Sequence, residues 1–157
     1  MGLVLKKITI KSQEGKLLIR ALSLKVSNGE IYSVMGPSGV GKSTLLDAIA
    51  GNLSDMFILS GAVELDGVDI SFLPSEKRRI GLLYQDSVLF PHLSVGQNLA
   101  FGLKIKNQSS FNRKTIVDQA LLQAGLEGFY DRDPETLSGG QKSRAALMRT
   151  LLSGPRA

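Results

Sequence analysis

The sequence contains no cysteine and only one histidine, His92, among its 157 residues. Without cysteine, neither a disulfide framework nor a thiolate-bound metal site can form. A single histidine also excludes a metal cluster built from several histidines of this chain. No run approaches the roughly 18 to 20 apolar residues that a membrane-spanning helix needs, and the N-terminus lacks a signal-peptide pattern. We therefore expect a cytoplasmic chain.

The net charge and its distribution along the sequence do not identify a binding partner for the chain. Lys and Arg exceed Asp and Glu by 19 to 14, for a formal net charge of +5. The basic residues are scattered, and only Lys6-Lys7 and Lys77-Arg78-Arg79 form clusters, which we interpret as solvated surface. The pattern predicts no nucleic-acid partner.

The N-terminal part has the pattern of strands joined by turns. Apolar residues alternate loosely with polar ones over residues 3–10 and 22–26, with Gly15 as a turn between them. Asn28-Gly29 is a good hairpin signal. The apolar run at residues 31–35 ends at a glycine-rich loop, which is typical of a buried strand.

Further strands are expected at residues 62–70 and 80–85. In the first, Val63 and Leu65 alternate with acidic residues, and Asp66-Gly67 forms a turn. The second is a short apolar run that follows charged residues and ends at Gln85.

Helical patterns occupy the rest of the chain. Residues 42–51, 112–124 and 139–152 have helical periodicity, with glycine or Gly-Pro where each would end. Ser94 and Gln97 have the spacing of a capping box. Strands first, one helix after a glycine loop, and then a helical block predict a mixed α/β core with a helical insertion.

Residues 36–43 fit the phosphate-binding pattern G-x-x-x-x-G-K-[ST] and join the apolar run to the first helix. Glycines let successive backbone N–H groups face an anion, and the following helix points its positive end at it. Lys42 supplies a mobile charge for the phosphates, and the Ser43 hydroxyl is a hard ligand for Mg²⁺. The candidate phosphate-binding residues are Gly36, Ser38, Gly39, Val40, Gly41, Lys42, Ser43 and Thr44.

A second glycine motif occurs at Leu137-Ser138-Gly139-Gly140-Gln141. It offers a hydroxyl and bare backbone amides at the start of a helix, which resembles another anion site. Two copies packed head to tail would use both motifs, each phosphate loop facing Ser138, Gly139 and Gly140 of the other copy. The alternative is a plain helix cap followed by two flexible glycines.

The LSGGQ sequence at 137–141 is the signature of the ATP-binding cassette (ABC) ATPases, and the chain resembles that family nearly from end to end. The resemblance implies a P-loop NTPase core with an antiparallel β subdomain and a helical signature subdomain. It also implies a division into residues 1–93, 94–152 and a tail at 153–157, with the C-terminal part of the core missing.

The resemblance assigns further roles. Gln85 matches the family's Q-loop glutamine, which contacts Mg²⁺ and the attacking water, whereas taken alone it would be an ordinary glutamine at the end of a strand. The cofactors implied are ATP and Mg²⁺, with Ser43 and Gln85 on the metal and Ser138, Gly139, Gly140 and Gln141 on the γ-phosphate of the partner copy. Residues 85–93 look like the stretch by which importer-type members contact two membrane permease subunits.

The implied protein is the ATP-binding subunit of an importer at the inner face of the membrane, served indirectly by an external solute-binding protein. An ABC ATPase of DNA repair or translation is an alternative, although the compact interval from Gln85 to Ser138 favours transport. A short nucleotide-binding regulator is another, and a simple kinase would leave the LSGGQ sequence unexplained.

Two departures from the family pattern have consequences. Members usually stack adenine on an aromatic residue at a position that falls near Gln13, and residues 11–15 contain none. We therefore expect weaker and less base-selective nucleotide binding. The chain also stops at Gly154-Pro155-Arg156-Ala157, before the family's Walker B strand and switch histidine. We expect a truncated form that binds nucleotide without turning it over, with its unpaired sheet edge covered by another copy or a rearranged segment.

Overall fold

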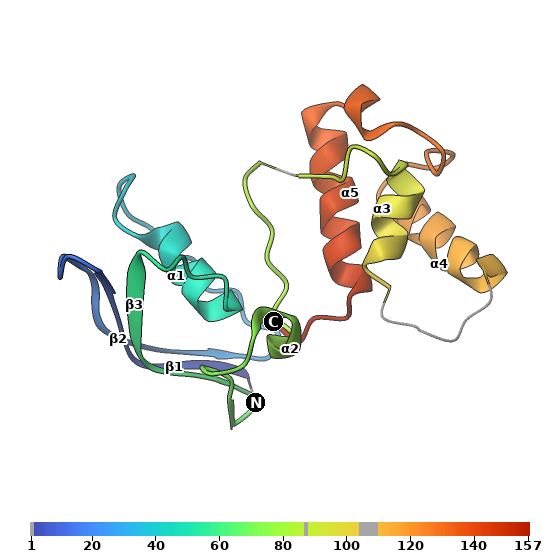
Figure 1. Cartoon of the computed structure of the whole chain (residues 1–157). Coiled ribbons are helices and arrows are strands. Elements are labelled where there is room, and N and C mark those ends of the chain that lie inside the picture. The colour runs from blue at the N-terminus through green and yellow to red at the C-terminus, as the bar shows by residue number, and fades with distance from the viewer. Residues whose placement is uncertain (1, 87, 104–109) are drawn as a thin grey trace. The chain divides into compact units, whose positions relative to one another are not determined.

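The computed structural model describes residues 2–86, 88–103 and 110–157, which form two compact units. The first unit contains the chain up to Ile80 together with Arg156–Ala157, and the second contains Gly81–Pro155. Figure 1 labels the helices and strands of each. The division at residue 80 is one of compactness, so the predicted functional division at residue 93 stays a prediction.

The first unit is built on a four-stranded antiparallel sheet. Its strands are β1 (Gly2–Ser12), β2 (Leu17–Ser27), β3 (Phe57–Leu65) and β4 (Val68–Asp69), in the order β2-β1-β3-β4. The register places Leu5 of β1 opposite Leu24 on one side and Val63 on the other, so apolar residues share one face. These strands confirm the predicted ones, and β3 begins five residues earlier than expected.

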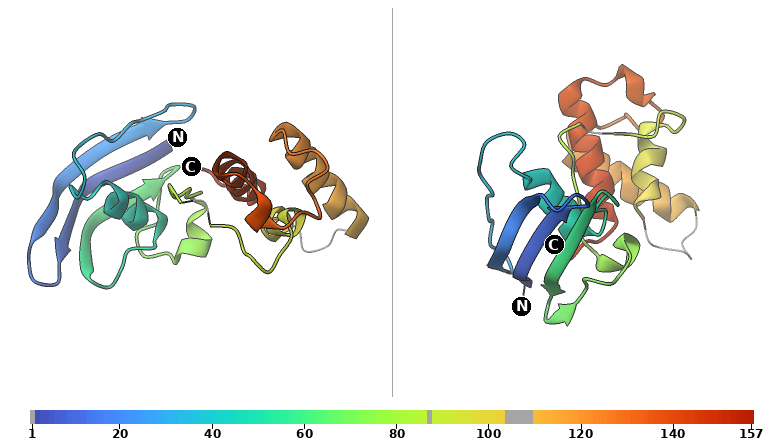
Figure 2. Two further views of the ribbon diagram at one scale, coloured as in Figure 1. Left: turned by 90° about the horizontal axis from the view of Figure 1, so that it is seen from above. Right: turned by 60° about the vertical axis from the view of Figure 1, so that its left-hand side comes forward.

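Helix α1 (Lys42–Ala50) covers the apolar face of this sheet, as the views in Figure 2 show. Its Leu45, Ala48 and Ile49 pack against buried residues of the sheet, which include Leu5, Ile8, Ile10, Val63 and Leu65. The helix ends at Gly51 in the left-handed conformation, as predicted. This packing fixes the position of the helix N-terminus, where the glycine-rich loop joins it.

Arg78 contradicts the expectation that Lys77-Arg78-Arg79 is solvated surface. It ends the short helix α2 (Ser75–Arg78) and is only 6% exposed. Its guanidinium donates to the carbonyl oxygens of Ala48 and Ile49 at the C-terminal end of α1, at 2.9 and 3.0 Å. It also donates to carbonyl oxygens of Leu73 and Ser71. A cation suits the negative end of a helix, and a guanidinium can satisfy several carbonyls at once.

The predicted strands at residues 31–35 and 80–85 do not form. Residues 31–35 are extended but exposed, with Ile31 at 93% and Met35 at 90%. A strand needs a hydrogen-bonded neighbour, and no strand within the described residues pairs with either segment. The turn at Asn28-Gly29 is present, but with no strand after it the predicted hairpin is wrong.

The second unit is helical. It contains α3 (Val95–Phe101), α4 (Ser110–Gln123), a 3₁₀ turn η1 (Pro134–Thr136) and α5 (Gly139–Leu152). The helices pack around one apolar core, whose buried members include Leu89, Val95, Leu99, Val117, Leu121, Leu126, Leu137 and Ala145. The predicted apolar face of α4 and the predicted limits of α5 are confirmed. Among the described residues, every helix is too short or too polar to cross a membrane.

Candidate functional site

The N-terminus of α1 has no side chain capping it. Its N-cap residue is Gly41, which has a left-handed backbone with φ 97° and cannot supply a side-chain acceptor. The Leu45 N–H donates to the Gly41 carbonyl at 2.9 Å, so intrahelical bonding begins there. The N–H groups of the first turn before it have no intrahelical acceptor. This end of the helix is therefore free to bind an anion.

The loop before α1 keeps its backbone accessible. Residues 36–40 are exposed, and Gly39 adopts φ 80°, which a residue with a side chain rarely does. Val40, at the tip, is 46% exposed. The left-handed backbone at Gly39 and Gly41 curves the chain, and successive N–H groups of such a curved loop can bind one anion.

The Lys42 side chain folds back over this loop. Its ammonium donates to the carbonyl oxygens of Gly36 and Pro37, at 2.8 and 2.7 Å. The side chain therefore holds the loop closed on itself and places a positive charge beside the Gly36 and Pro37 carbonyls. Ser43 lies exposed in the first turn of α1, where its hydroxyl can act as a metal ligand, and Thr44 beside it is partly buried. The donor set fits a phosphate group and its Mg²⁺ counter-ion.

The signature motif opens helix α5 in the second unit. Ser138 is its N-cap: the Ser138 Oγ accepts from the Gln141 N–H at 3.3 Å, and Gln141 Oε1 accepts from the Ser138 N–H at 2.9 Å. This capping box occupies the serine oxygen as an acceptor and leaves the hydroxyl proton to donate. Gly139 and Gly140 are exposed, and a Cβ added to either would meet no atom within 4 Å. The motif is open to a ligand from outside the chain.

Gln85 belongs to the second unit and lies in an irregular, exposed segment. It is therefore not the strand-end residue that the sequence predicts. The structure shows its amide accessible, and its assignment to Mg²⁺ stays a prediction. Gln13 is held in the first unit by its side-chain amide, which donates to the Asp55 carbonyl at 2.9 Å.

The sequence did not predict that Asn98 and Arg149 hold the backbone of residues 88–94. Asn98 is completely buried in α3, and Arg149 of α5 hydrogen-bonds to the same segment. The available signal for Asn98 was a polar residue at a position where helical periodicity places core. Arg149 carried no signal, since an arginine late in an amphipathic helix is usually solvated.

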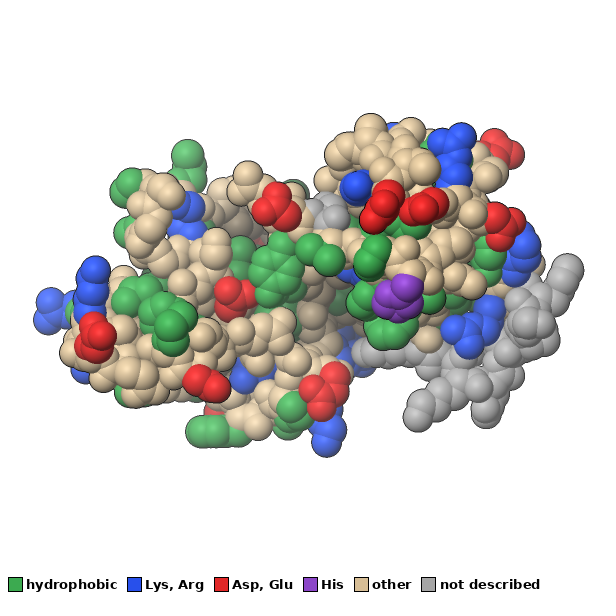
Figure 3. All heavy atoms as spheres, turned by 45° about the horizontal axis from the view of Figure 1, so that its top comes forward, with side chains coloured by type: hydrophobic (Ala, Val, Ile, Leu, Met, Phe, Trp, Pro, Cys, Tyr) green, Lys and Arg blue, Asp and Glu red, His purple; other side chains and the backbone are tan. Residues whose placement is uncertain are grey.

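The charge on one face of the molecule is mixed. On the face drawn in Figure 3 the Lys and Arg side chains lie apart from one another, interspersed with acidic groups. The one histidine, His92, is exposed. Within the described residues no group of three or more His, Asp or Glu is placed to hold a metal ion, so a metal here depends on the hydroxyl and amide ligands and on the phosphates themselves.

Comparison with known proteins agrees with this geometry. The model of the ABC transporter family matches residues 19–157. The chain is 42% identical over 155 residues to the uncharacterized ABC transporter ATP-binding protein YnjD of Escherichia coli K12, covering 99% of this chain and 70% of YnjD. It is 40% identical over 152 residues to the spermidine/putrescine import ATP-binding protein PotA of Aggregatibacter actinomycetemcomitans, covering 97% of this chain but only 40% of PotA.

Among solved structures, the chain resembles the ATP-binding cassette MJ0796, determined as a post-hydrolysis dimer bound to ADP and Pi. The TM-score is 0.82 at 31% identity, covering 98% of this chain and 70% of MJ0796. The predicted fold class, a P-loop ABC ATPase with an antiparallel sheet and a helical part, is thereby confirmed. With the family model matching most of its length, the chain belongs to the ABC transporter family of ATP-binding proteins.

Proposed function

We propose that this chain binds MgATP as part of the ATP-binding subunit of an importer. The observation that carries the proposal is the N-terminus of α1, which has no side-chain cap, lies behind left-handed glycines and has the Lys42 ammonium folded over it. Membership in the ABC family makes ATP the expected nucleotide. The importer assignment is supported by the 40% identity to PotA, whose name describes import.

Each proposed residue contributes a distinct interaction. The backbone amides of Gly36 and of residues 38–44 bind phosphate oxygens, and Lys42 exchanges its two carbonyl acceptors for the β- and γ-phosphates. The Ser43 hydroxyl and the Gln85 amide serve as ligands to Mg²⁺, which neutralises phosphate charge when bound. Gln85 also orients water.

The remaining proposals concern partners. Ser138, Gly139, Gly140 and Gln141 contact the γ-phosphate held by a second copy, in a head-to-tail dimer; the open surroundings of both glycines support this. Residues 85–93 receive two permease subunits, which place the protein at the inner face of the membrane, and a solute-binding protein acts at a distance. The solute is small, and its identity is determined by those partners.

Lys42→Ala tests the proposal. We expect the 157-residue chain to bind a fluorescent ATP analogue with Mg²⁺, and Lys42→Ala to weaken binding about 10- to 100-fold, because a charge-assisted contact is lost. Lys77→Ala, at an exposed lysine of the same unit, is the matched control and should bind like the wild type. Unchanged affinity in Lys42→Ala would refute the site.

Two further readouts of the same titration sharpen it. GTP should bind about as well as ATP, because residues 11–15 offer no aromatic ring to adenine; tight binding of ATP alone would contradict this. We also propose that these 157 residues by themselves do not turn ATP over. Steady phosphate release that disappears in Lys42→Ala would overturn that part and leave the binding site intact.

A further inference from the structure

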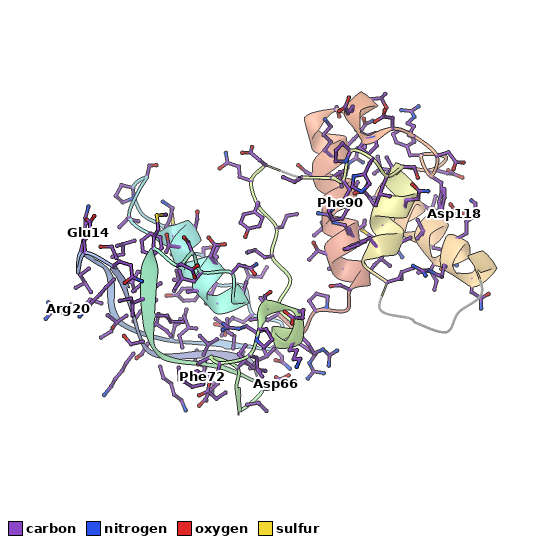
Figure 4. The ribbon with its side chains drawn as sticks, in the orientation of Figure 1. Glu14, Arg20, Asp66, Phe72, Phe90 and Asp118 are labelled. Atoms are coloured by element: carbon purple, nitrogen blue, oxygen red, sulfur yellow. The ribbon has the colours of Figure 1, made fainter. Side chains whose placement is uncertain are left out.

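Arg149 connects α5 to the segment that precedes α3. Its Nη2 donates to the Val88 carbonyl at 2.8 Å, and its Nη1 reaches Asn98 Oδ1 at 3.4 Å. The guanidinium also lies over the ring of Phe90, 5.0 Å from its centroid; Figure 4 labels Phe90. Burial lowers the pKa of Arg149 from its usual value, which is consistent with a partly enclosed cation. One side chain of α5 therefore contacts residues 88 and 90 and helix α3.

Asn98 fixes the shape of the same segment. Its Oδ1 accepts from the Phe90 N–H at 2.7 Å, and its Nδ2 donates to the carbonyls of Phe90, Leu93 and Ser94 at 3.0 to 3.1 Å. The side chain is fully buried, so each lost bond would leave a polar group without water. The backbone of residues 90–94 is therefore held in one conformation by a single amide, whose oxygen Arg149 also contacts.

Helices α3 and α5 are closely packed next to Arg149. Gly102 is the C-cap residue of α3, and a Cβ added there would lie 2.2 Å from the Arg149 carbonyl oxygen. Only glycine therefore allows the two helices to pack this closely. Phe101 packs edge-on against Phe90, with centroids 4.9 Å apart. Backbone, ring and guanidinium contacts thus meet at one place, which makes a rigid junction.

The other end of α5 carries the signature motif. Ser138 begins the helix and Arg149 lies 11 residues later, so an α-helical rise of about 1.5 Å per residue separates them by about 17 Å. Both residues belong to one continuous helix, so a shift of one end along the helix axis is passed to the other. A displacement of Ser138 toward a bound γ-phosphate therefore moves Arg149 and, through it, the carbonyl of Val88.

We propose that Arg149 is a positioning residue that couples the signature end of α5 to residues 88–94, so that nucleotide bound at Ser138 changes the conformation presented to a partner. The coupling rests on the proposed function, because it assumes that Ser138 contacts nucleotide. The hydrogen bonds from Arg149 and Asn98 to residues 88–94, called the tie below, do not depend on that assumption.

Hydrogen exchange of backbone amides tests the tie without nucleotide. In Arg149→Met we expect the amides of residues 88–90 and 92–94 to exchange about tenfold faster or more than in the wild type, because the guanidinium no longer holds the Val88 carbonyl and Asn98 in place. Arg149→Lys should recover part of the protection. The matched control is Arg144→Met: Arg144 is on the same helix but donates to the Ala124 carbonyl, away from this segment. Exchange rates unchanged by Arg149→Met, or raised equally by Arg144→Met, would overturn the tie.

The same amides test the coupling with a hydrolysis-resistant ATP analogue and Mg²⁺. We expect nucleotide to alter the protection of residues 88–94 in the wild type, and this change to disappear in Arg149→Met while the affinity for the analogue stays within about twofold. A merely structural role would instead weaken binding and the response together, which would refute coupling. A response that survives in Arg149→Met would also refute it. If the wild type binds no nucleotide, the proposed function and the coupling fail, whereas the exchange rates without nucleotide still decide the tie.

Discussion

Helix α1 in the first unit begins at Gly41 without a side-chain cap, whereas α3 and α5 in the second unit begin at Ser94 and Ser138 with complete capping boxes. The capping boxes satisfy the N-cap and N3 amides of α3 and α5, and in α5 they leave the Gly139 and Gly140 amides without an intrahelical acceptor. The helix left without a cap keeps its amides available, and it follows the phosphate-binding sequence. The uncapped α1 therefore offers more unbonded amides to an anion than α3 or α5 does, at the expense of local stability.

The two units also differ in the range of the contacts that hold them. The first unit depends on strands paired across up to about 60 residues and on Arg78, which lies 29 and 30 residues from the α1 carbonyls it binds. In the second unit Arg149 makes a contact of similar range, to the Val88 carbonyl, but the helix starts are held by caps between residues three apart. Substitutions at Arg78, Ser94 and Asp69 test this difference between the two units.

The largest expected effect is on the long-range contacts. Arg78→Met should lower the free energy of unfolding of the first unit by about 2–4 kcal/mol, because four carbonyl bonds are lost at a buried site. Urea denaturation measures it. Lys77→Met, at the exposed neighbouring lysine, is the control and should change stability little. Equal effects of the two substitutions would show that Arg78 is not buried in solution.

A smaller effect is expected from the local contacts. Ser94→Ala removes the acceptor for the Gln97 N–H and should cost the second unit about 1 kcal/mol. Ser94→Asp keeps an acceptor there and should restore most of the loss. Ser33→Ala, at an exposed serine outside any helix, serves as the control. Equal denaturation midpoints for Ser94→Ala and Ser33→Ala would show that the Ser94 cap does not contribute to the stability of the second unit.

The smallest effect is an acid sensitivity confined to the first unit. Hydrogen bonds from Ser71, first from its side chain and then from its backbone, hold the pKa of Asp69 below its ordinary value. Because the folded-state pKa is the lower one, this stabilisation is present above the unfolded-state pKa and is lost as pH falls through the folded one. Below about pH 4 the wild type should lose slightly more stability than Asp69→Asn. Parallel denaturation curves for the two proteins from pH 5 downward would contradict this.

The same distinction explains how much of the fold the sequence could predict. The capping box of Ser94 and Gln97 and the glycine caps at Gly51 and Gly125 are local signals, and the structure has all of them. The predictions of strands at residues 31–35 and 80–85 were wrong, because an apolar run becomes a strand only when a neighbouring strand pairs with it.

For the candidate site, the phosphate loop and the signature motif were readable because their chemistry is encoded in consecutive residues. The hydrogen-bond partners of Arg78, Asn98 and Arg149 could not be predicted, since each binds carbonyls that only tertiary packing brings near. Backbone acceptors carry no sequence signal, so residues that hold a site in shape are harder to predict than residues that touch a ligand.

The Lys42 ammonium, bonded to the carbonyls of Gly36 and Pro37, gives nucleotide binding a competitive character. Two of the three N–H groups of the ammonium are already bonded, so an arriving phosphate competes with two internal acceptors. The measured affinity is then a difference between external and internal bonds, and association includes a step in which the ammonium leaves its own loop. The two carbonyls hold the ammonium at the loop when no phosphate is bound.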